Sequence, residues 1–207
     1  ALKTSKGHSG AFSALRDPRI HLLALVYCAV CVGSAVIGTW GPSILKSAGV
    51  TDLKQLGMLM MLPYLTAAIT MYLVGRSSDR LLERRWHVIV PSLVAAIAFL
   101  VLGLPDIGVP VTLLMLCLAA AGVYSATPVF WTIPPTYLGK DTAATGIAFI
   151  SSVGAGAAGF GSAALLGWIM AETGSLSVGL SSVGVLIILG CGLFLACMPI
   201  RLLRLKR

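Results

Sequence analysis

Charged side chains are scarce in this chain, and acidic ones are the scarcest. Charged residues make up 11% of the 207 residues, with 7 Asp and Glu against 15 Lys and Arg. A water-soluble domain carries roughly 25% charged residues because its surface faces water. Hydrophobic residues make up 57% of this chain, and its mean hydropathy is +0.96. The composition therefore excludes an ordinary soluble domain and indicates a membrane protein.

The chain also lacks the alternation of apolar and polar residues that a membrane β-barrel requires. It has instead six apolar stretches of the roughly 20 residues that a membrane-spanning helix needs. Backbone polar groups in lipid must be satisfied internally, which a helix achieves. The sequence thus predicts an all-α, polytopic protein, with a leader over residues 1–19, a six-helix bundle over 20–200 and a basic tail over 201–207. The expected spans are about 22–45, 56–75, 86–104, 109–131, 143–170 and 176–199.

Basic residues are distributed unevenly about these spans. An even number of spans places both termini on one side, and only Lys46 and Lys54 then lie on the other. Cytoplasmic loops carry an excess of Lys and Arg, so both termini are expected in the cytoplasm, with the spans in the plasma (inner) membrane. This placement accounts for the net charge of +8 without nucleic acid, which is not expected as a partner, and the lipid bilayer's anionic headgroups are expected to contact the basic ends. The residues on the cytoplasmic side are Lys3, Lys6, Arg16, Arg19, Arg76, Arg80, Arg84, Arg85, Lys140, Arg201, Arg204, Lys206 and Arg207.

No Asp, Glu, Lys, Arg or His lies near the middle of an expected span. A proton-coupled transporter normally has a protonatable group there, so this chain alone holds no obvious proton relay or cationic clamp for an anion. The five cysteines lie in apolar stretches, and Cys28 and Cys31 lack the second pair that a zinc or redox site would need. We expect no catalytic residue, metal or cofactor.

Milder polar and aromatic residues gather in the first, second, fourth and fifth spans. Pro42, Pro63 and Pro128 fall in or near three of these spans and should kink or end their helices. Broken helices persist in membranes where they line a cavity, so these four spans are predicted to line a polar path. The alternative for each Ser or Thr is a bond to its own helix, and for Pro42 a simple helix end. The candidate substrate-cavity residues are Tyr27, Trp40, Tyr64, Tyr124, Trp131, Ser151 and Ser152.

The fifth span contains a literal GxGxxG at Gly154–Gly159. A dinucleotide site uses this pattern between a strand and a helix, and here it would lie in the middle of a membrane helix. We expect these small residues to permit close helix packing instead.

Charge is concentrated in the run GRSSDRLLERR, at Gly75–Arg85. Its spacing resembles the G-x-x-x-D-R-x-G-x-R-R motif of the major facilitator superfamily, with Leu82 where the family usually has glycine. FWTIPPTYL at 130–138 and GIAFISSVGAGAAGF at 146–160 resemble spans ten and eleven of its anion:cation symporter branch, which includes tartrate-, phthalate-, hexuronate- and galactonate-type transporters. The motif positions are Gly75, Asp79, Arg80, Arg84 and Arg85.

This resemblance implies that the chain is the C-terminal half of a twelve-span transporter, with residues 1–19 the end of a central cytoplasmic loop. The N-terminal half would supply the anion clamp and the protonatable carboxylates. The implied activity is secondary active, proton-coupled uptake of a small organic anion, such as a carboxylate or sugar acid, by alternating access. The resemblance thus implies a transporter and not an enzyme. Related transporters often have Asn in span eleven, where Ser151 and Ala155 stand here. The alternatives are a six-span protein that acts as a dimer or sensor, and a membrane-embedded enzyme.

The five motif positions are further expected to form a conformational gate. A carboxylate at Asp79 can face the positive N-terminus of a neighbouring helix, and in the family that helix belongs to the other half. Such a contact would hold the cytoplasmic side closed. The alternative is that the motif only fixes topology and that Asp79 is solvated.

Overall fold

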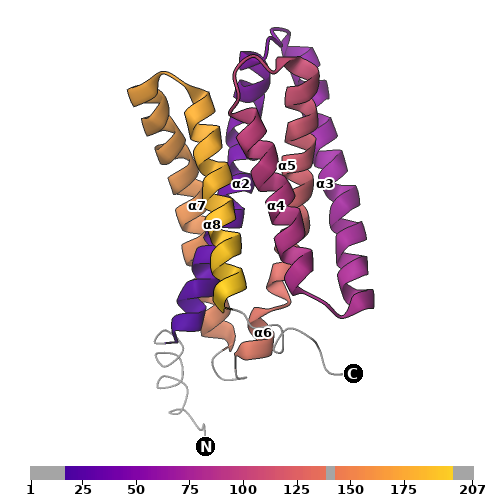
Figure 1. The fold of residues 1–207 in the computed structure, drawn as a ribbon, viewed down its shortest axis with the longest axis vertical. Helices are drawn as coiled ribbons and strands as arrows, with labels where there is room; N and C mark the ends of the chain where they lie inside the picture. Colours follow the sequence, from indigo (N-terminus) through magenta and orange to yellow (C-terminus); the bar gives the residue numbers. More distant parts are fainter. Residues whose placement is uncertain (1–16, 139–142, 198–207) are drawn as a thin grey trace, which may run out of the picture.

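The computed structural model describes residues 17–138 and 143–197, and its core is a bundle of six long helices (Figure 1). All six are long and apolar enough to cross a membrane. A helix of four residues, α6 (Pro134–Tyr137), lies in the connection between the fourth and fifth long helices. The long helices are α2 (Pro18–Ser47), α3 (Leu53–Leu81), α4 (Arg85–Leu102), α5 (Gly108–Trp131), α7 (Ala143–Thr173) and α8 (Leu176–Cys197).

The helix α2 lies at the centre of the packing. It contacts α5, α7 and α8, while α4 packs on α5 and α8, and α3 packs mainly on α5. Figure 1 accordingly shows α7 and α8 on one side of α2, and α3, α4 and α5 on the other. The start of α2, the turn between α3 and α4, α6 and the end of α8 all lie at the lower end of the bundle in this view. We call this the motif end.

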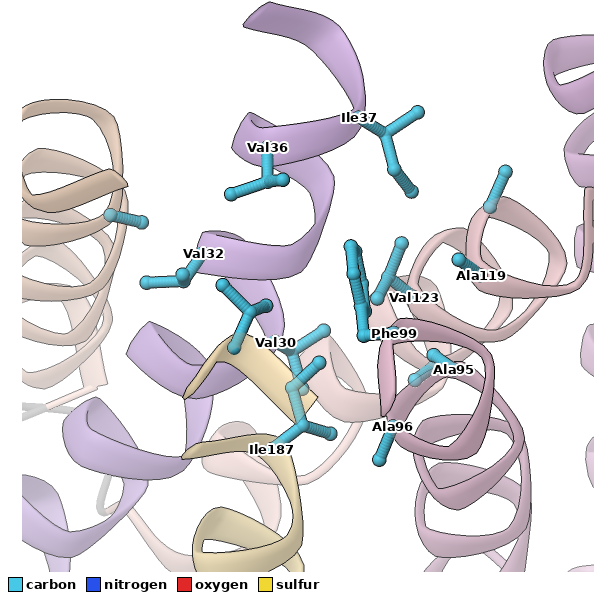
Figure 2. Close-up of a cluster of buried hydrophobic side chains, with 14 of the residues drawn as sticks. Val30, Val32, Val36, Ile37, Ala95, Ala96, Phe99, Ala119, Val123 and Ile187 are labelled. Atoms are coloured by element: carbon cyan, nitrogen blue, oxygen red, sulfur yellow. The ribbon is translucent and has the colours of Figure 1, made fainter. Parts of the chain in front are cut away.

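A dense apolar core forms where α2, α4, α5 and α8 meet. Phe99 of α4 is fully buried there between side chains of the other three helices (Figure 2). Gly33 permits this approach, because a Cβ at its position would lie 2.7 Å from Val123 Cγ1 and 3.2 Å from Phe99 and Ile187 atoms. Small residues at such contacts let membrane helices gain van der Waals packing where lipid offers little hydrophobic drive.

The helices form at the six apolar stretches, and some of them extend beyond the expected spans. The helix α3 continues for six residues beyond Gly75 and ends at Leu81, so most of the expected loop at 76–85 is helical. Polar residues such as Arg76 and Arg80 sustain a helix as well as apolar ones do, and hydropathy therefore underestimates its length. The short α6 also replaces part of an expected loop.

The prolines do not end their helices. Pro42, Pro63 and Pro128 all lie inside continuous helices, so the alternative of a helix end at Pro42 is wrong. Each proline lacks the N–H that would bond to the carbonyl four residues earlier. The carbonyls of Gly38, Leu59 and Tyr124 are therefore without their usual helical donor.

Candidate functional site

An ion pair joins the end of α3 to the start of α4 within the charged motif. Arg84 Nη1 donates to Asp79 Oδ1 at 2.6 Å and to Ser78 Oγ at 3.2 Å. The Arg84 side chain is 15% exposed, whereas that of Asp79 is 68% exposed. Asp79 is therefore neither merely solvated nor buried, and most of its surface is free for a further partner.

Glu83 and His87 close the other side of the same turn. The Glu83 carboxylate accepts from Trp86 N–H at 3.0 and 3.1 Å, which satisfies one of the free amides at the start of α4. His87 Nδ1 lies 3.2 Å from Glu83 Oε2, and its Nε2 lies 3.0 Å from Ser77 Oγ. The imidazole thus links the carboxylate to the last turns of α3.

Arg85 of α4 bonds to the neighbouring helix α8. Its Nη2 donates to the Leu195 carbonyl at 2.7 Å, and the residue is only 8% exposed. Leu195 lies near the end of the described part of α8, and the residue four positions later in the sequence, Pro199, has no N–H to donate to its carbonyl. Arg85 therefore holds the start of α4 to the end of α8.

The backbone conformation of Leu82 explains why the motif usually has glycine at this position. It ends α3 in the left-handed region, with φ 51° and ψ 34°, and its N–H donates to the Ser78 carbonyl. Glycine adopts this conformation without the steric cost that a Cβ imposes. Leu82 therefore adopts a conformation that suits glycine better than leucine.

The remaining motif positions lie on the outer face of α3. Arg80 is exposed, and no described atom beyond the neighbouring backbone of α3 lies within 4 Å of where a Cβ on Gly75 would stand. Both line a shallow hollow of about 510 Å³ together with Met71, Tyr72, Arg76 and Asp79.

The cavity candidates fall into separate groups, and the first is buried within this bundle. Tyr27 of α2 is only 8% exposed. Its ring stacks on Phe130 at a centroid distance of 5.1 Å and meets the edge of Trp131 at 4.8 Å, both on α5. Gly154 of α7 faces the same ring, since a Cβ there would lie 3.0 Å from Tyr27 Cε1. Tyr27 is therefore a packing centre of three helices as well as a cavity candidate.

The second group is more open. Tyr64 of α3 is 42% exposed, and its ring centroid lies 6.2 Å from that of the half-buried Tyr124 on α5. A Cβ on Gly38 of α2 would lie 4.0 Å from the Tyr64 hydroxyl. Gly38 was not among the residues expected from the sequence, although small residues in membrane helices often mark helix contacts. The other candidates lie apart: Trp40 packs partly buried against the core, Ser151 is half-buried and Ser152 is exposed.

Several other hydroxyls in these spans bond to their own helices, as the alternative interpretation held, whereas the buried hydroxyl of Ser125 has no hydrogen-bond partner among the described residues. Thr39 donates to the Ala35 carbonyl at 2.7 Å, and Thr127 donates to that of Val123 at 2.9 Å. The same pattern holds for Ser34, Thr66 and Thr70. Among the candidate residues of these spans, the aromatic rings are therefore the main groups left to contact a bound molecule.

Comparison with known proteins decides the family. The family model of the Major Facilitator Superfamily matches residues 2–162. The chain belongs to the Major Facilitator Superfamily. The chain is 36% identical, over 91% of its length, to a protein of Agrobacterium vitis named "Putative tartrate transporter", and covers 42% of that protein.

Two other relatives of this superfamily chain also have names that describe transport. It is 35% identical over 86% of its length to the Pseudomonas putida "Putative metabolite transport protein NicT", and covers 40% of that protein. It is 33% identical over 88% of its length to the Acinetobacter baumannii "Quinolone resistance transporter", and covers 42% of it. The chain thus spans about two fifths of the length of these relatives. Its six helices form one half of the superfamily fold, and the names indicate a transporter.

Charge in the described part of this superfamily half lies at or near the helix ends. Within residues 17–138 and 143–197, every charged residue lies in a connection or within two turns of a helix end. A hollow of about 480 Å³ lies at the end opposite the motif, and none of the seven cavity candidates lines it. It lies between the end of α2, the α4–α5 connection and the start of α8.

Proposed function

We propose that this chain is the C-terminal half of a secondary transporter that takes up a small organic anion together with protons, by alternating access. The observation that carries the proposal is the combination of superfamily membership with aromatic, uncharged spans. A substrate carboxylate needs a cationic partner, and a proton relay needs a titratable group. We assign the cationic partner and the titratable group to the other half. The relatives are long enough to contain such a half, because this chain covers only 42% of one of them.

The edges of the bundle support the presence of that other half. The helix α3 carries a row of exposed apolar side chains, among them Met61, Leu65 and Ile69. At the opposite edge, Phe160 of α7 is 80% exposed. In the proposed complete transporter, parts of these faces pack against the N-terminal six helices, and the remainder contacts lipid.

We place both termini in the cytoplasm and the spans in the inner membrane. The motif end carries Arg19, Arg76, Arg80, Arg84 and Arg85, while Lys46 and Lys54 lie at the other end. This bias supports the assignment, because cytoplasmic loops are enriched in basic residues.

Uptake by the full-length protein in proteoliposomes tests this function. Labelled tartrate, galactonate and phthalate are offered in turn, with an imposed inward proton gradient and then without it. We expect the gradient to drive accumulation of at least one acid, and a protonophore to abolish that accumulation. Uptake that depends on sodium alone would contradict proton coupling. Absence of uptake for all three acids would favour the six-span sensor instead.

A further inference from the structure

The hollow of about 480 Å³ at the end opposite the motif lies at the upper end of the bundle in Figure 1. Its walls are the end of α2, the connection between α4 and α5, and the start of α8. The edges that we assigned to contact with the other half belong to α3 and α7, and no described residue of these two helices lines the hollow. The hollow therefore stays open when the other half is in place. Small-molecule sites typically enclose roughly 300–1,000 Å³, so its size suits a small ligand. We call it the outer hollow.

The chain beside the outer hollow has a defined course. Gly103, directly after α4, lets α4 and α8 meet, because a Cβ there would lie 2.9 Å from the Ser177 carbonyl oxygen. The connection to α5 then passes through two residues in the left-handed region, Asp106 with φ 56° and Gly108 with φ 68°. Aspartate adopts this region more readily than most residues that carry a Cβ. Asp106, Gly108 and Ser177 all line the outer hollow.

The charge of the outer hollow is negative. Asp106 is the one charged residue among the described residues that line it. No ion pair joins Asp106 to another described residue. The helix dipoles do not reverse this sign, because α2 and α4 end here while α5 and α8 begin here, and their end charges oppose each other. A cation is therefore favoured over an anion.

The hydroxyls that line the outer hollow include two whose hydrogens are already used. Ser47 Oγ donates to the Ile44 carbonyl at 2.8 Å, and Thr112 Oγ1 donates to the Gly108 carbonyl at 2.8 Å. A hydroxyl has one hydrogen to donate and two lone pairs that accept. Ser47 and Thr112 thus resemble the Asp106 carboxylate in offering acceptors. A ligand with N–H donors suits this lining.

Apolar side chains complete the walls of the outer hollow. Leu102 and Leu104 come from the end of α4 and the residues after it, Ile107 from the connection, and Leu180 from α8. Burial of an alkyl group against such side chains is favourable, in proportion to the apolar area removed from water. A ligand with an apolar body beside its charged group therefore matches both parts of the lining.

We propose that the outer hollow binds an organic cation that carries a primary ammonium group on an apolar body, with the ammonium at Asp106. This site is separate from the seven cavity candidates, and it does not depend on the transport function proposed above. An occupant contacts α2, the α4–α5 connection and α8 together, so it should stabilise the folded protein. A soluble amine and the amine headgroup of a lipid share this chemistry.

The test measures binding to the purified full-length protein by isothermal titration calorimetry, in a non-ionic detergent and an amine-free buffer. Three probes share one alkyl body: hexylamine, hexyltrimethylammonium and hexanol. We expect hexylamine to bind most tightly, because hexyltrimethylammonium lacks N–H donors and hexanol lacks charge. Asp106→Asn should raise the Kd for hexylamine roughly threefold to fivefold, the effect of one exposed ion pair. Asparagine also adopts the left-handed region, so without an amine the thermal midpoint should stay unchanged.

Two further variants separate the hollow from general surface charge. Glu172→Gln removes an exposed negative charge at the same end but outside the outer hollow, and the Kd for hexylamine should stay the same. Ala48 lines the outer hollow in a conformation that leucine also adopts. Ala48→Leu should therefore fill part of the space and weaken binding of all three probes at least threefold.

The source of the amine is identified in nanodiscs of phosphatidylcholine, with and without phosphatidylethanolamine. A rise in the thermal midpoint with phosphatidylethanolamine, lost in Asp106→Asn, identifies the lipid amine as the occupant. Hexylamine binding without that rise identifies a soluble amine. Equal affinity for hexanol and hexylamine overturns the proposal, as do equal effects of Asp106→Asn and Glu172→Gln. Absence of binding by any probe at millimolar concentration also overturns it, and none of these results bears on organic anion uptake.

Discussion

Asp79 and Arg84 form an ion pair of 2.6 Å across the turn that joins α3 to α4, and the aspartate remains largely exposed. The pair lies within one half of the fold, yet it occupies only part of the carboxylate surface. An exposed ion pair contributes less than about 1 kcal/mol, so a stronger partner could compete for Asp79. We propose the N-terminus of a helix in the other half as that partner when the cytoplasmic side is closed.

Asp79→Asn should therefore shift the full-length transporter toward its inward-open state. We expect cysteine labelling from the cytoplasmic side to increase severalfold at a cavity position, while the thermal midpoint changes by only a few degrees. Asp106→Asn, an exposed aspartate at the opposite end, is the control and should change neither quantity. If the labelling in Asp79→Asn equals that of the unmodified protein, the motif serves topology and the local turn alone.

Leu82→Gly should stabilise the protein. A leucine in the left-handed region costs roughly 1–2 kcal/mol, and glycine relieves this cost. The half-buried leucine side chain loses some contacts, so we expect a net gain of about 1 kcal/mol and a rise of about 2–4 °C in the thermal midpoint in detergent. Leu81→Gly, one residue earlier in helical conformation, should lower the midpoint instead. A fall in both variants would show that the Leu82 contacts outweigh its backbone strain.

The six helices could be predicted from hydropathy because lipid imposes both length and internal hydrogen bonding. The end of α3 could not, since Arg76, Ser77 and Ser78 have no apolar signal and the helix stops only at the left-handed Leu82. The motif spacing correctly indicated a family. It did not show that Arg84 pairs with Asp79 or that Arg85 reaches α8, because these contacts depend on how three helices meet.

The candidate site was less predictable than the fold. Composition placed polar residues on four spans, but a Ser or Thr in a helix can bond to its own backbone, and Thr39 and Thr127 do so. Tyr27 looked like a cavity residue, yet it is buried against Gly154, which lies more than a hundred residues later in the chain. Only three-dimensional packing separates such a residue from the exposed Tyr64.

Arg85→Met should destabilise the bundle through its contact with α8. A hydrogen bond from a charged donor to a buried carbonyl contributes about 1.5–3 kcal/mol, and methionine keeps most of the side-chain volume without donating. We expect the thermal midpoint in detergent to fall by roughly 3–12 °C. The exposed Arg80→Met removes the same charge on α3 and should leave the midpoint nearly unchanged. Equal effects of the two substitutions would show that net charge, rather than the Leu195 contact, determines stability.

Gly154→Ala should separate α7 from α2, whereas Gly156→Ala two residues later should not. A Cβ on Gly154 would lie 3.0–3.1 Å from two Tyr27 ring atoms and closer still to a third, Cδ1, and the ring is fixed between Phe130 and Trp131. Overpacking of this kind typically costs 1–3 kcal/mol, so the thermal midpoint should fall by several degrees. No described atom beyond the neighbouring backbone of α7 lies within 4 Å of a Cβ on Gly156, and alanine there should preserve or slightly raise the midpoint, because it favours helix. Tyr27→Leu added to Gly154→Ala should recover part of the loss by removing the ring. If both glycine variants lose stability equally, the effect arises from the backbone of α7 and not from its contact with Tyr27.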